Sequence, residues 1–354
     1  MPNEKKIAIV GAGAVGAHVG GYLQREGHDP TLIDIWPEHV ETMRTEGLTL
    51  EGMTEPECFT IKMNALQVTE LQRAAKSDPF DIAFICAKSY DTVWLTQMIA
   101  GYLAEDGFCV SLQNSINEER IASVVGWDKV VGCIASTIAL DLDRPGHVNR
   151  NVALGGDWHT IFRIGEPHGR ITRRIEEVAD LLRPCDSART TKNLWGERWT
   201  KLCVNAMRNS ISAATGRGGN ANDRDPTTRR LSILLAAEAV MVGRAHGYDI
   251  EDIYKITPDQ LLDALGGDLA AMEATEAIIL DNASLRNDDQ RPSMGQDIQK
   301  GRRTEIDYIN GLVVEKATEL GLTVPFNARI AEAVRLVERG EIPPSPDAVA
   351  GIDS

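Results

Sequence analysis

Short apolar runs alternate with helix-length segments through the first part of the chain. Each run is short enough for a strand and apolar enough to be buried on both faces. Strands that alternate with helices predict a parallel, doubly wound sheet, whose ligands gather at the carboxyl ends of the strands. The predicted strands cover residues 6–10, 30–34, 80–88, 108–114 and 129–135.

The pattern changes beyond the last of these strands. Residues 147–155 and 160–165 are predicted to extend the sheet as a hairpin, and residues 170–182 to form a helix. The polar segment 184–193 contains proline and aspartate and precedes a remainder with an almost wholly helical pattern. We therefore place a domain boundary in this segment.

Several helix starts are marked in the remainder. Asp225-Pro226 and Thr257-Pro258 each combine an N-cap residue with proline in the first turn. Ser293 and Gln296 have the spacing of a capping box, and they are predicted to open one long helix that closes near Gly321.

The first helix of the remainder, over residues 195–214, is apolar around most of its circumference and is predicted to be buried. Its polar stripe is Lys201, Asn205, Arg208, Asn209 and Ser212. Polar groups are costly to bury without partners. An amine beside two carboxamides is suited to a small-molecule site, because the amine can protonate a carbonyl oxygen and the amides can hold neighbouring oxygens. The alternative is a structural polar seam between packed helices.

A glycine-rich turn follows the first predicted strand and precedes a helix. Gly11 permits the tight turn, Gly13 lets the backbone approach a pyrophosphate, and Gly16 lets helix and strand pack closely. The second strand ends in Asp34, as a dinucleotide site requires. This order of elements predicts a dinucleotide site, the alternative being a glycine turn without a ligand. The predicted cofactor-binding turn is Gly11, Ala12, Gly13, Ala14, Val15 and Gly16.

Lys88 and Asn114 stand at the carboxyl ends of two further predicted strands. Each is a candidate ligand contact, the alternative being an ordinary polar residue that is exposed to solvent where its strand ends. Together these patterns predict an α/β protein. We expect a Rossmann domain with a doubly wound sheet over residues 1–186, an all-helical substrate and catalytic domain over 187–342, and a flexible tail over 343–354.

Composition narrows the class of protein. A chain of 354 residues suits two domains, and a formal charge of −15 argues against nucleic acid or an anionic membrane as partner. No apolar run approaches the ~18 residues of a membrane span, and the N-terminus lacks a signal-peptide core, so we predict a cytoplasmic protein. The six cysteines and seven histidines show no metal-ligand spacing, which predicts reduced thiols and no metal.

Six motifs resemble the ketopantoate reductase family, a group of dinucleotide-dependent 2-oxo acid reductases. The resemblance covers nearly the whole chain and implies a Rossmann domain joined to a helical domain like that of 6-phosphogluconate dehydrogenase, with the active site in the cleft between them. The motifs are GAGAVG at Gly11, CAKSYDT around Lys88, LQNS at Asn114, WTKLCVNAMRN from Trp199, SMGQDI from Ser293 and GRRTEIDYING from Gly301.

The resemblance also implies residue roles. Lys201 matches the family's general acid, which protonates the ketone oxygen, and Glu305 matches the acid that pairs with this lysine. Burial would ease loss of the lysine proton and a nearby carboxylate would oppose it, so the two groups would tune each other. Matches to substrate-binding residues are Asn205, Asn209, Ser293 and Asn114, and further cofactor contacts are expected from Lys88, Asn114 and Glu305.

Three segments depart from the family pattern. Ser115 replaces the usual glycine, and residues 290–294 and 217–222 replace two segments that help hold the substrate. The reaction type is therefore better supported than the substrate. Two alternatives stay open: an NAD-dependent D-2-hydroxy acid dehydrogenase of broader or catabolic role, and a non-catalytic dinucleotide sensor, which would tolerate loss of Lys201 and Glu305.

The cofactor is predicted to be NAD(H), with NADP(H) less favoured, against the habit of the family. Asp34 can accept hydrogen bonds from ribose hydroxyls, whereas a 2′-phosphate would meet its negative charge. Residues 35–38 include no Arg or Lys. The predicted partner is a small 2-oxo or 2-hydroxy acid. The sequence is compatible with a homodimer and leaves oligomeric state and reaction direction open.

Overall fold

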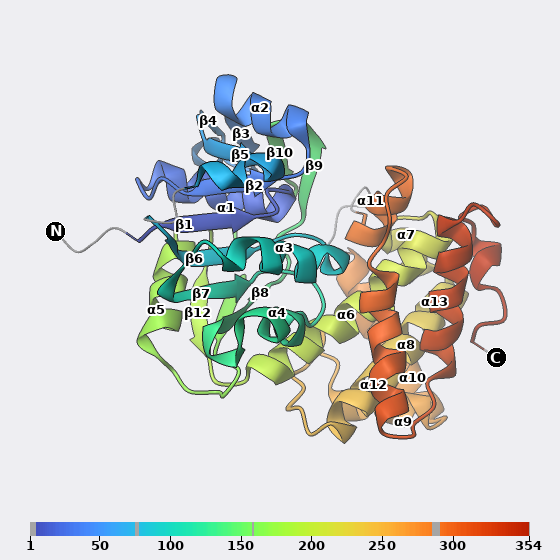
Figure 1. Ribbon diagram of the computed structural model, residues 1–354. Helices are drawn as coiled ribbons and strands as arrows, with labels where there is room; N and C mark the ends of the chain where they lie inside the picture. The colour runs from blue at the N-terminus through green and yellow to red at the C-terminus, as the bar shows by residue number, and fades with distance from the viewer. Residues whose placement is uncertain (1–4, 75–77, 158, 285–290, 354) are drawn as a thin grey trace. The chain divides into compact units, whose positions relative to one another are not determined.

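The computed structural model describes residues 5–74, 78–157, 159–284 and 291–353. The chain divides into two compact units between Leu194 and Trp195 (Figure 1). This division lies beyond the boundary expected after residue 186, because strand β12 (Ala188–Thr191) pairs with β11 in the first unit.

The first unit is built on an eight-stranded sheet in the order β12-β11-β8-β7-β6-β1-β2-β5. Its strands from β8 to β5 are all parallel, and β11 runs antiparallel to β8. The predicted parallel, doubly wound sheet is confirmed. The strands other than β12 are β1 (Ile7–Val10), β2 (Thr31–Asp34), β5 (Asn64–Gln67), β6 (Phe80–Ile85), β7 (Leu103–Ser111), β8 (Val130–Ala135) and β11 (Phe162–Gly165).

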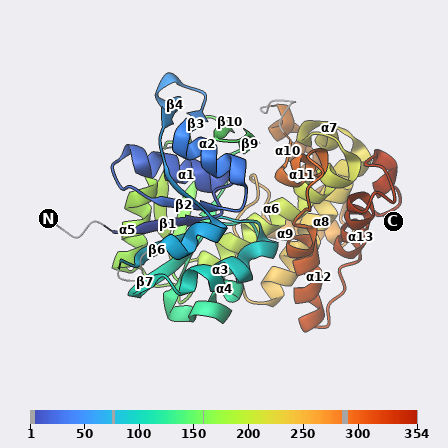
Figure 2. The same ribbon diagram turned by 45° about the horizontal axis from the view of Figure 1, so that its top comes forward.

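Helices cover both faces of this sheet. Ile7 and Ile9 of β1 join one apolar cluster, while the alternate residues Ala8 and Val10 join another. The first cluster includes side chains of α1 (Ala14–Arg25) and α5 (Arg173–Leu182). The second includes side chains of α3 (Thr92–Ala100) and α4 (Glu118–Val125), which lie side by side in Figure 2. Burial on both faces explains the continuous apolar runs of these strands.

A second sheet of four strands was not predicted. Its order is β4-β3-β10-β9, with β3 (Leu48–Glu51), β4 (Phe59–Ile61), β9 (Leu140–Arg144) and β10 (His147–Arg150). The hairpin expected between residues 147–155 and 160–165 is wrong. β10 pairs with β3 and β9 in this smaller sheet, whereas β11 pairs with β8 and β12 in the larger one.

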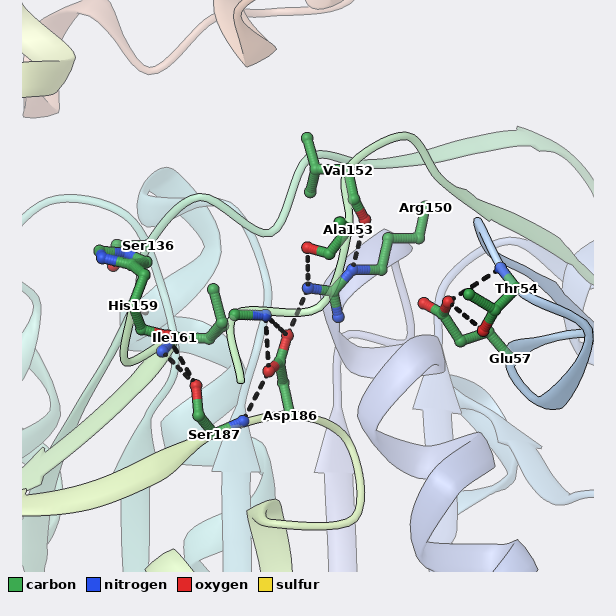
Figure 3. A network of polar contacts seen from close by, with 11 residues as sticks. Thr54, Glu57, Ser136, Arg150, Val152, Ala153, His159, Ile161, Asp186 and Ser187 are labelled. Carbon is green, nitrogen blue, oxygen red and sulfur yellow. Dashed lines mark hydrogen bonds and ion pairs between the residues drawn. The ribbon is translucent and has the colours of Figure 1, made fainter. Parts of the chain in front are cut away.

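The segment that leads from β10 back to β11 is held by a buried ion pair (Figure 3). Arg150 and Asp186 are each about 1% exposed at the side chain, and Arg150 also donates to the carbonyls of Val152 and Ala153. Asp186 accepts the backbone N–H of Gly155 at 3.0 Å. The Asp186 carboxylate thus joins Arg150 of β10 to the Gly155 backbone in this segment.

The regular elements described in the second unit are helical, as predicted. Asp225 accepts the backbone N–H groups of Thr227 and Thr228, and Thr257 accepts that of Gln260, so the two predicted N-caps are confirmed. The helices α12 and α13 pack against α8 (Figure 1). The helices are α6 (Leu194–Thr215), α7 (Gly219–Arg224), α8 (Pro226–Ala245), α9 (Pro258–Leu265), α10 (Leu269–Ser284), α11 (Ser293–Gln299), α12 (Asn310–Glu319) and α13 (Pro325–Glu338).

The long helix expected from Ser293 to Gly321 is interrupted. The first piece, α11, ends before Gly301, whose φ of +60° is incompatible with an α-helix, and a short 3-10 helix (Ile306–Tyr308) precedes α12. The predicted capping box is also wrong, because Pro292 occupies the N-cap position and no side-chain cap forms.

The tail expected to be flexible packs against the second unit as far as residue 353. Val349 is fully buried, and the Ser345 backbone N–H donates to the Ala214 carbonyl. A search of the described helices for one long and apolar enough to span a bilayer finds none.

Candidate functional site

The glycine-rich turn between β1 and α1 is packed tightly from behind. Gly11 has a φ of +88°, and a Cβ there would lie 2.7 Å from the Ala87 backbone nitrogen. A Cβ on Gly16 would lie 2.3 Å from the Gly11 carbonyl oxygen. Both positions therefore require glycine for space, and Gly11 also requires it for its backbone conformation.

Gly13 differs from both, because beyond its chain neighbours no atom of the described residues lies within 4 Å of where its Cβ would be. It is the N-cap residue of α1, whose first N–H groups have no partner within the helix. A turn that packs tightly at Gly11 and Gly16 but leaves space at Gly13, next to a helix N-terminus, fits the pyrophosphate of a dinucleotide. The structure thus supports the predicted role of Gly11–Gly16 as a cofactor cradle.

Asp34 ends β2, the strand next to β1, as the sequence predicted. Its carboxylate accepts the backbone N–H of Trp36 at 2.9 Å and is half-buried. Ile35, between them, is 57% exposed. This bond fixes the direction of one carboxylate oxygen at the carboxyl edge of the sheet.

The segments that carry Lys88 and Asn114 follow the neighbouring strands β6 and β7, and side chains tie them together. Ser89 donates to the Asn114 carbonyl at 3.4 Å, and Gln113 donates to the Ala87 carbonyl at 2.7 Å. Ser115 has a φ of +67°, a conformation that favours glycine. The positive φ explains why glycine is usual at this position in the ketopantoate reductase family, which the sequence resembles.

The polar stripe of α6 is largely buried in the second unit. Asn205 is 4% and Asn209 8% exposed, and Lys201 is half-buried. Two members of the stripe have structural partners: Arg208 pairs with Asp223 at 3.0 Å, and Ser212 donates to the Arg217 carbonyl.

Ser293 lies beside this stripe. Asn209 Nδ2 donates to Ser293 Oγ at 3.4 Å, so two predicted substrate-binding residues from distant parts of the chain meet. The close approach depends on Gly295, where a Cβ would lie 2.2 Å from Ser212 Oγ. The sequence prediction missed Gly295, although a glycine in the first turn of a helix was a visible departure from helix propensity.

Glu305 is 4% exposed and lies in the break between α11 and α12. Five residues later, Asn310 donates to the Ala206 carbonyl at 3.2 Å, so the start of α12 lies against α6 between Asn205 and Asn209. The chain thus brings the segment that carries Glu305 to the same stretch of α6 that carries the asparagine stripe.

Comparisons with known proteins agree over both units. The family model described as ketopantoate reductase PanE/ApbA matches residues 7–160, and the model of its C-terminal region matches residues 193–338. A 2-dehydropantoate 2-reductase of Pyrococcus horikoshii is 31% identical, over 94% of this chain and 97% of the relative. Its counterpart from Archaeoglobus fulgidus is 28% identical, over 95% and 99%.

Solved structures show the same fold. The PanE/ApbA family ketopantoate reductase from Ralstonia eutropha is 27% identical, with a TM-score of 0.75 over 95% of this chain and 99% of that one. A D-mandelate dehydrogenase solved with NADH and anilino(oxo)acetate has a TM-score of 0.77 over 95% and 98%, at 22% identity. At that identity the second likeness concerns the fold alone.

Proposed function

Since the chain belongs to the ketopantoate reductase family, we propose that it reduces a 2-oxo acid with NADH, and that 2-dehydropantoate is its first candidate substrate. The chain is a nicotinamide-dependent oxidoreductase that interconverts a 2-oxo acid and its 2-hydroxy acid. The names of the Pyrococcus and Archaeoglobus relatives support the proposed substrate.

Lys201 is the proposed proton donor. When bound, the nicotinamide supplies a hydride to the carbonyl carbon, so the chain itself must supply the proton for the oxygen. The Lys201 ammonium is the one charged amine on the polar stripe of α6, one turn from the buried Asn205. A positioned amine there can give its proton to a ketone oxygen held by the asparagine amides. The carboxylate of Glu305 would then restore or retain the charge of the lysine.

The observation that carries the proposal is the contact between Asn209 and Ser293 beside this stripe. An amide donor and a hydroxyl donor side by side suit a substrate carboxylate, because each can direct a hydrogen bond to one of its oxygens. A 2-oxo acid places such a carboxylate next to its ketone. Asn114, which follows β7, stays a proposed substrate contact.

Replacement of Lys201 tests this assignment. Positioned general acids contribute roughly 100- to 10,000-fold in rate, so Lys201→Ala should lower kcat by about that much. NADH affinity, measured by fluorescence titration, should change little. Lys192→Ala, at an exposed lysine, is the matched control and should leave both quantities unchanged. Near-normal turnover of Lys201→Ala would remove the lysine from the mechanism.

Asp34 is the proposed reason for NADH preference. Its carboxylate can accept the ribose hydroxyls of the adenosine, whereas a 2′-phosphate would bring about two negative charges to it. No cation follows within residues 35–38, and like charges without a cation cost several kcal/mol. We expect kcat/KM to favour NADH over NADPH by at least about tenfold. Members of the family that make pantoate typically use NADPH, so a preference for NADH would set this chain apart from them.

Steady-state kinetics with both cofactors at fixed substrate test the preference. Asp34→Ala should narrow the gap between them, while Glu38→Ala, at an exposed carboxylate four residues on, should not. A wild-type preference for NADPH would refute the proposed role of Asp34 and would favour a more distant cation, such as Lys88, as the phosphate partner.

A broader or catabolic D-2-hydroxy acid dehydrogenase is the second candidate. Ser115 and residues 217–222 depart from the family at segments that hold its substrate, and NADH use would suit oxidation of a hydroxy acid. A screen of 2-oxo acids that includes 2-dehydropantoate separates the two candidates by their kcat/KM values. The non-catalytic sensor would show no turnover with any of them.

Oligomeric state and location stay predictions. A structural neighbour from Staphylococcus aureus is described as a dimeric ketopantoate reductase. A homodimer is therefore the state to test first for this chain by light scattering.

A further inference from the structure

His39 is a fully buried histidine that contacts the glycine-rich turn. It lies in α2 (Pro37–Thr45), the helix that follows Asp34. Its Nε2 atom lies 2.8 Å from the Ala12 carbonyl oxygen, and the Gly146 backbone N–H points at its Nδ1 atom from 2.8 Å. A carbonyl oxygen only accepts and an amide N–H only donates. Both bonds therefore require a neutral ring with its hydrogen on Nε2.

The Ala12 carbonyl belongs to the same peptide plane as the Gly13 N–H. In a trans peptide these two groups point in opposite directions, and every described peptide of this chain is free of the cis form. A donor that holds the oxygen on the inner side therefore turns the Gly13 N–H outward. Gly13 itself is half-buried, and beyond its chain neighbours no described atom lies within 4 Å of where its Cβ would be, so the turn leaves space beside this peptide.

Other contacts keep the ring in place. The Trp36 and His39 rings stack with centroids 5.6 Å apart and an interplanar angle of 28°. Burial lowers the pKa of His39, which keeps the neutral form present at physiological pH. The backbone of the turn is tied separately, by the Gly11 N–H to the Ile33 carbonyl at 2.8 Å. His39 is thus placed to orient the peptide between Ala12 and Gly13.

We propose that His39 is a positioning residue for the cofactor: its Nε2–H holds the Ala12–Gly13 peptide so that the Gly13 N–H meets the pyrophosphate of NADH. This rests on the proposed function, because it assumes that the glycine-rich turn binds a dinucleotide. His39 itself touches neither the cofactor nor the substrate in this role.

Two amide variants separate the two hydrogen bonds of the ring. The Gln side chain in His39→Gln places a donor nitrogen near the position of Nε2 and so can still hold the Ala12 carbonyl. The Asn side chain in His39→Asn places an acceptor oxygen near the position of Nδ1 and so can hold only the Gly146 N–H. Each variant keeps one bond and loses the ring, so a merely structural role predicts similar effects from both.

The measurement is the NADH dissociation constant of the full chain, by fluorescence titration, with melting temperatures recorded beside it. We expect His39→Asn to bind NADH about five- to tenfold more weakly than wild type, and His39→Gln to stay within about twofold. The melting temperatures of the two variants should fall by similar amounts. Equal NADH affinities for the two variants would overturn the inference.

Wild-type protein gives an independent measurement if a variant does not fold. In protein labelled with ¹⁵N-histidine, His39 should show the Nε2–H tautomer, and NADH should shift its Nε2 resonance more than its Nδ1 resonance. The other tautomer, or an Nε2 resonance that NADH leaves in place, overturns the inference. Failure of the wild type to bind NADH at all would instead refute the proposed function.

Discussion

His18 should make the protein lose stability as the pH falls below neutrality. It lies in α1 beside the glycine-rich turn, is 3% exposed and packs against the Tyr22 ring with centroids 4.8 Å apart. Its Nε2 atom finds no hydrogen-bond partner within the part of the chain that the structure describes. Burial, and after it the positive charge of Arg150, lower the pKa of His18 from 6.5 to about 3.

The sign of the effect follows from proton uptake. The unfolded chain binds a proton at His18 below pH 6.5, whereas the folded protein does so only near pH 3. Between these values the unfolded state holds more protons, so the free energy of unfolding decreases as the pH decreases. From pH 7 to pH 5 this one side chain should remove about 2 kcal/mol, and it should contribute nothing above pH 7.

Urea unfolding at pH 7 and pH 5 measures the effect, with His18→Leu as the variant. Leucine has a similar volume and no charge, so the variant should lose about 2 kcal/mol less than wild type over this range. Subtracting the change in unfolding free energy of the variant from that of wild type cancels the contributions of other titrating groups. These include His39, whose pKa is also lowered by burial. His28→Leu, at a half-buried histidine after the end of α1, is the control and should follow wild type. Equal pH dependence of wild type and His18→Leu would show that His18 titrates normally in the folded protein.

Two further substitutions test the proposed substrate site at Ser293 and the strained backbone at Ser115. Ser293→Ala should raise KM for a 2-oxo acid by about tenfold or more, because a charge-assisted hydrogen bond is lost, and should barely change KM for a neutral ketone. Ser284→Ala, at an exposed serine, is the control. Equal effects of Ser293→Ala on both substrates would contradict carboxylate binding. Ser115→Gly should be about 1 kcal/mol more stable than Ser115→Ala in urea unfolding, because only glycine adopts a φ of +67° without strain, and equal stabilities would remove strain as the reason.

The sequence predicted those parts of the fold that depend on local pattern. The buried strands β1, β2, β6 and β8 carry continuous apolar runs because both of their faces are covered. The turn at Gly11 was predictable because steric limits on its backbone admit little but glycine. The smaller sheet was not predictable in this way, because its strands are only three to five residues long and β3 pairs with β10 from a distant part of the chain.

The site shows the same division. The spacing of Lys201, Asn205 and Asn209 is a property of one helix, so the stripe could be predicted from α6 alone. The capping box at Ser293 failed because Pro292 takes the N-cap position, and the Ser293 hydroxyl accepts from Asn209 in the folded chain. His39 gave no pattern to detect, since both of its partners are backbone groups of residues that fold beside it.

The contact between Asp34 and Trp36 makes Asp34→Asn a sharper test of cofactor choice than Asp34→Ala. The carboxylate accepts the Trp36 N–H, and the Trp36 ring stacks on His39, which holds the glycine-rich turn. Asp34→Ala removes the charge and this bond together, so it should weaken both cofactors through the turn while it relieves the repulsion of the 2′-phosphate. Asp34→Asn keeps an acceptor oxygen for Trp36 and removes only the charge. It should therefore raise kcat/KM for NADPH by about tenfold, and a variant that gains nothing with NADPH would show that charge at this position does not select the cofactor.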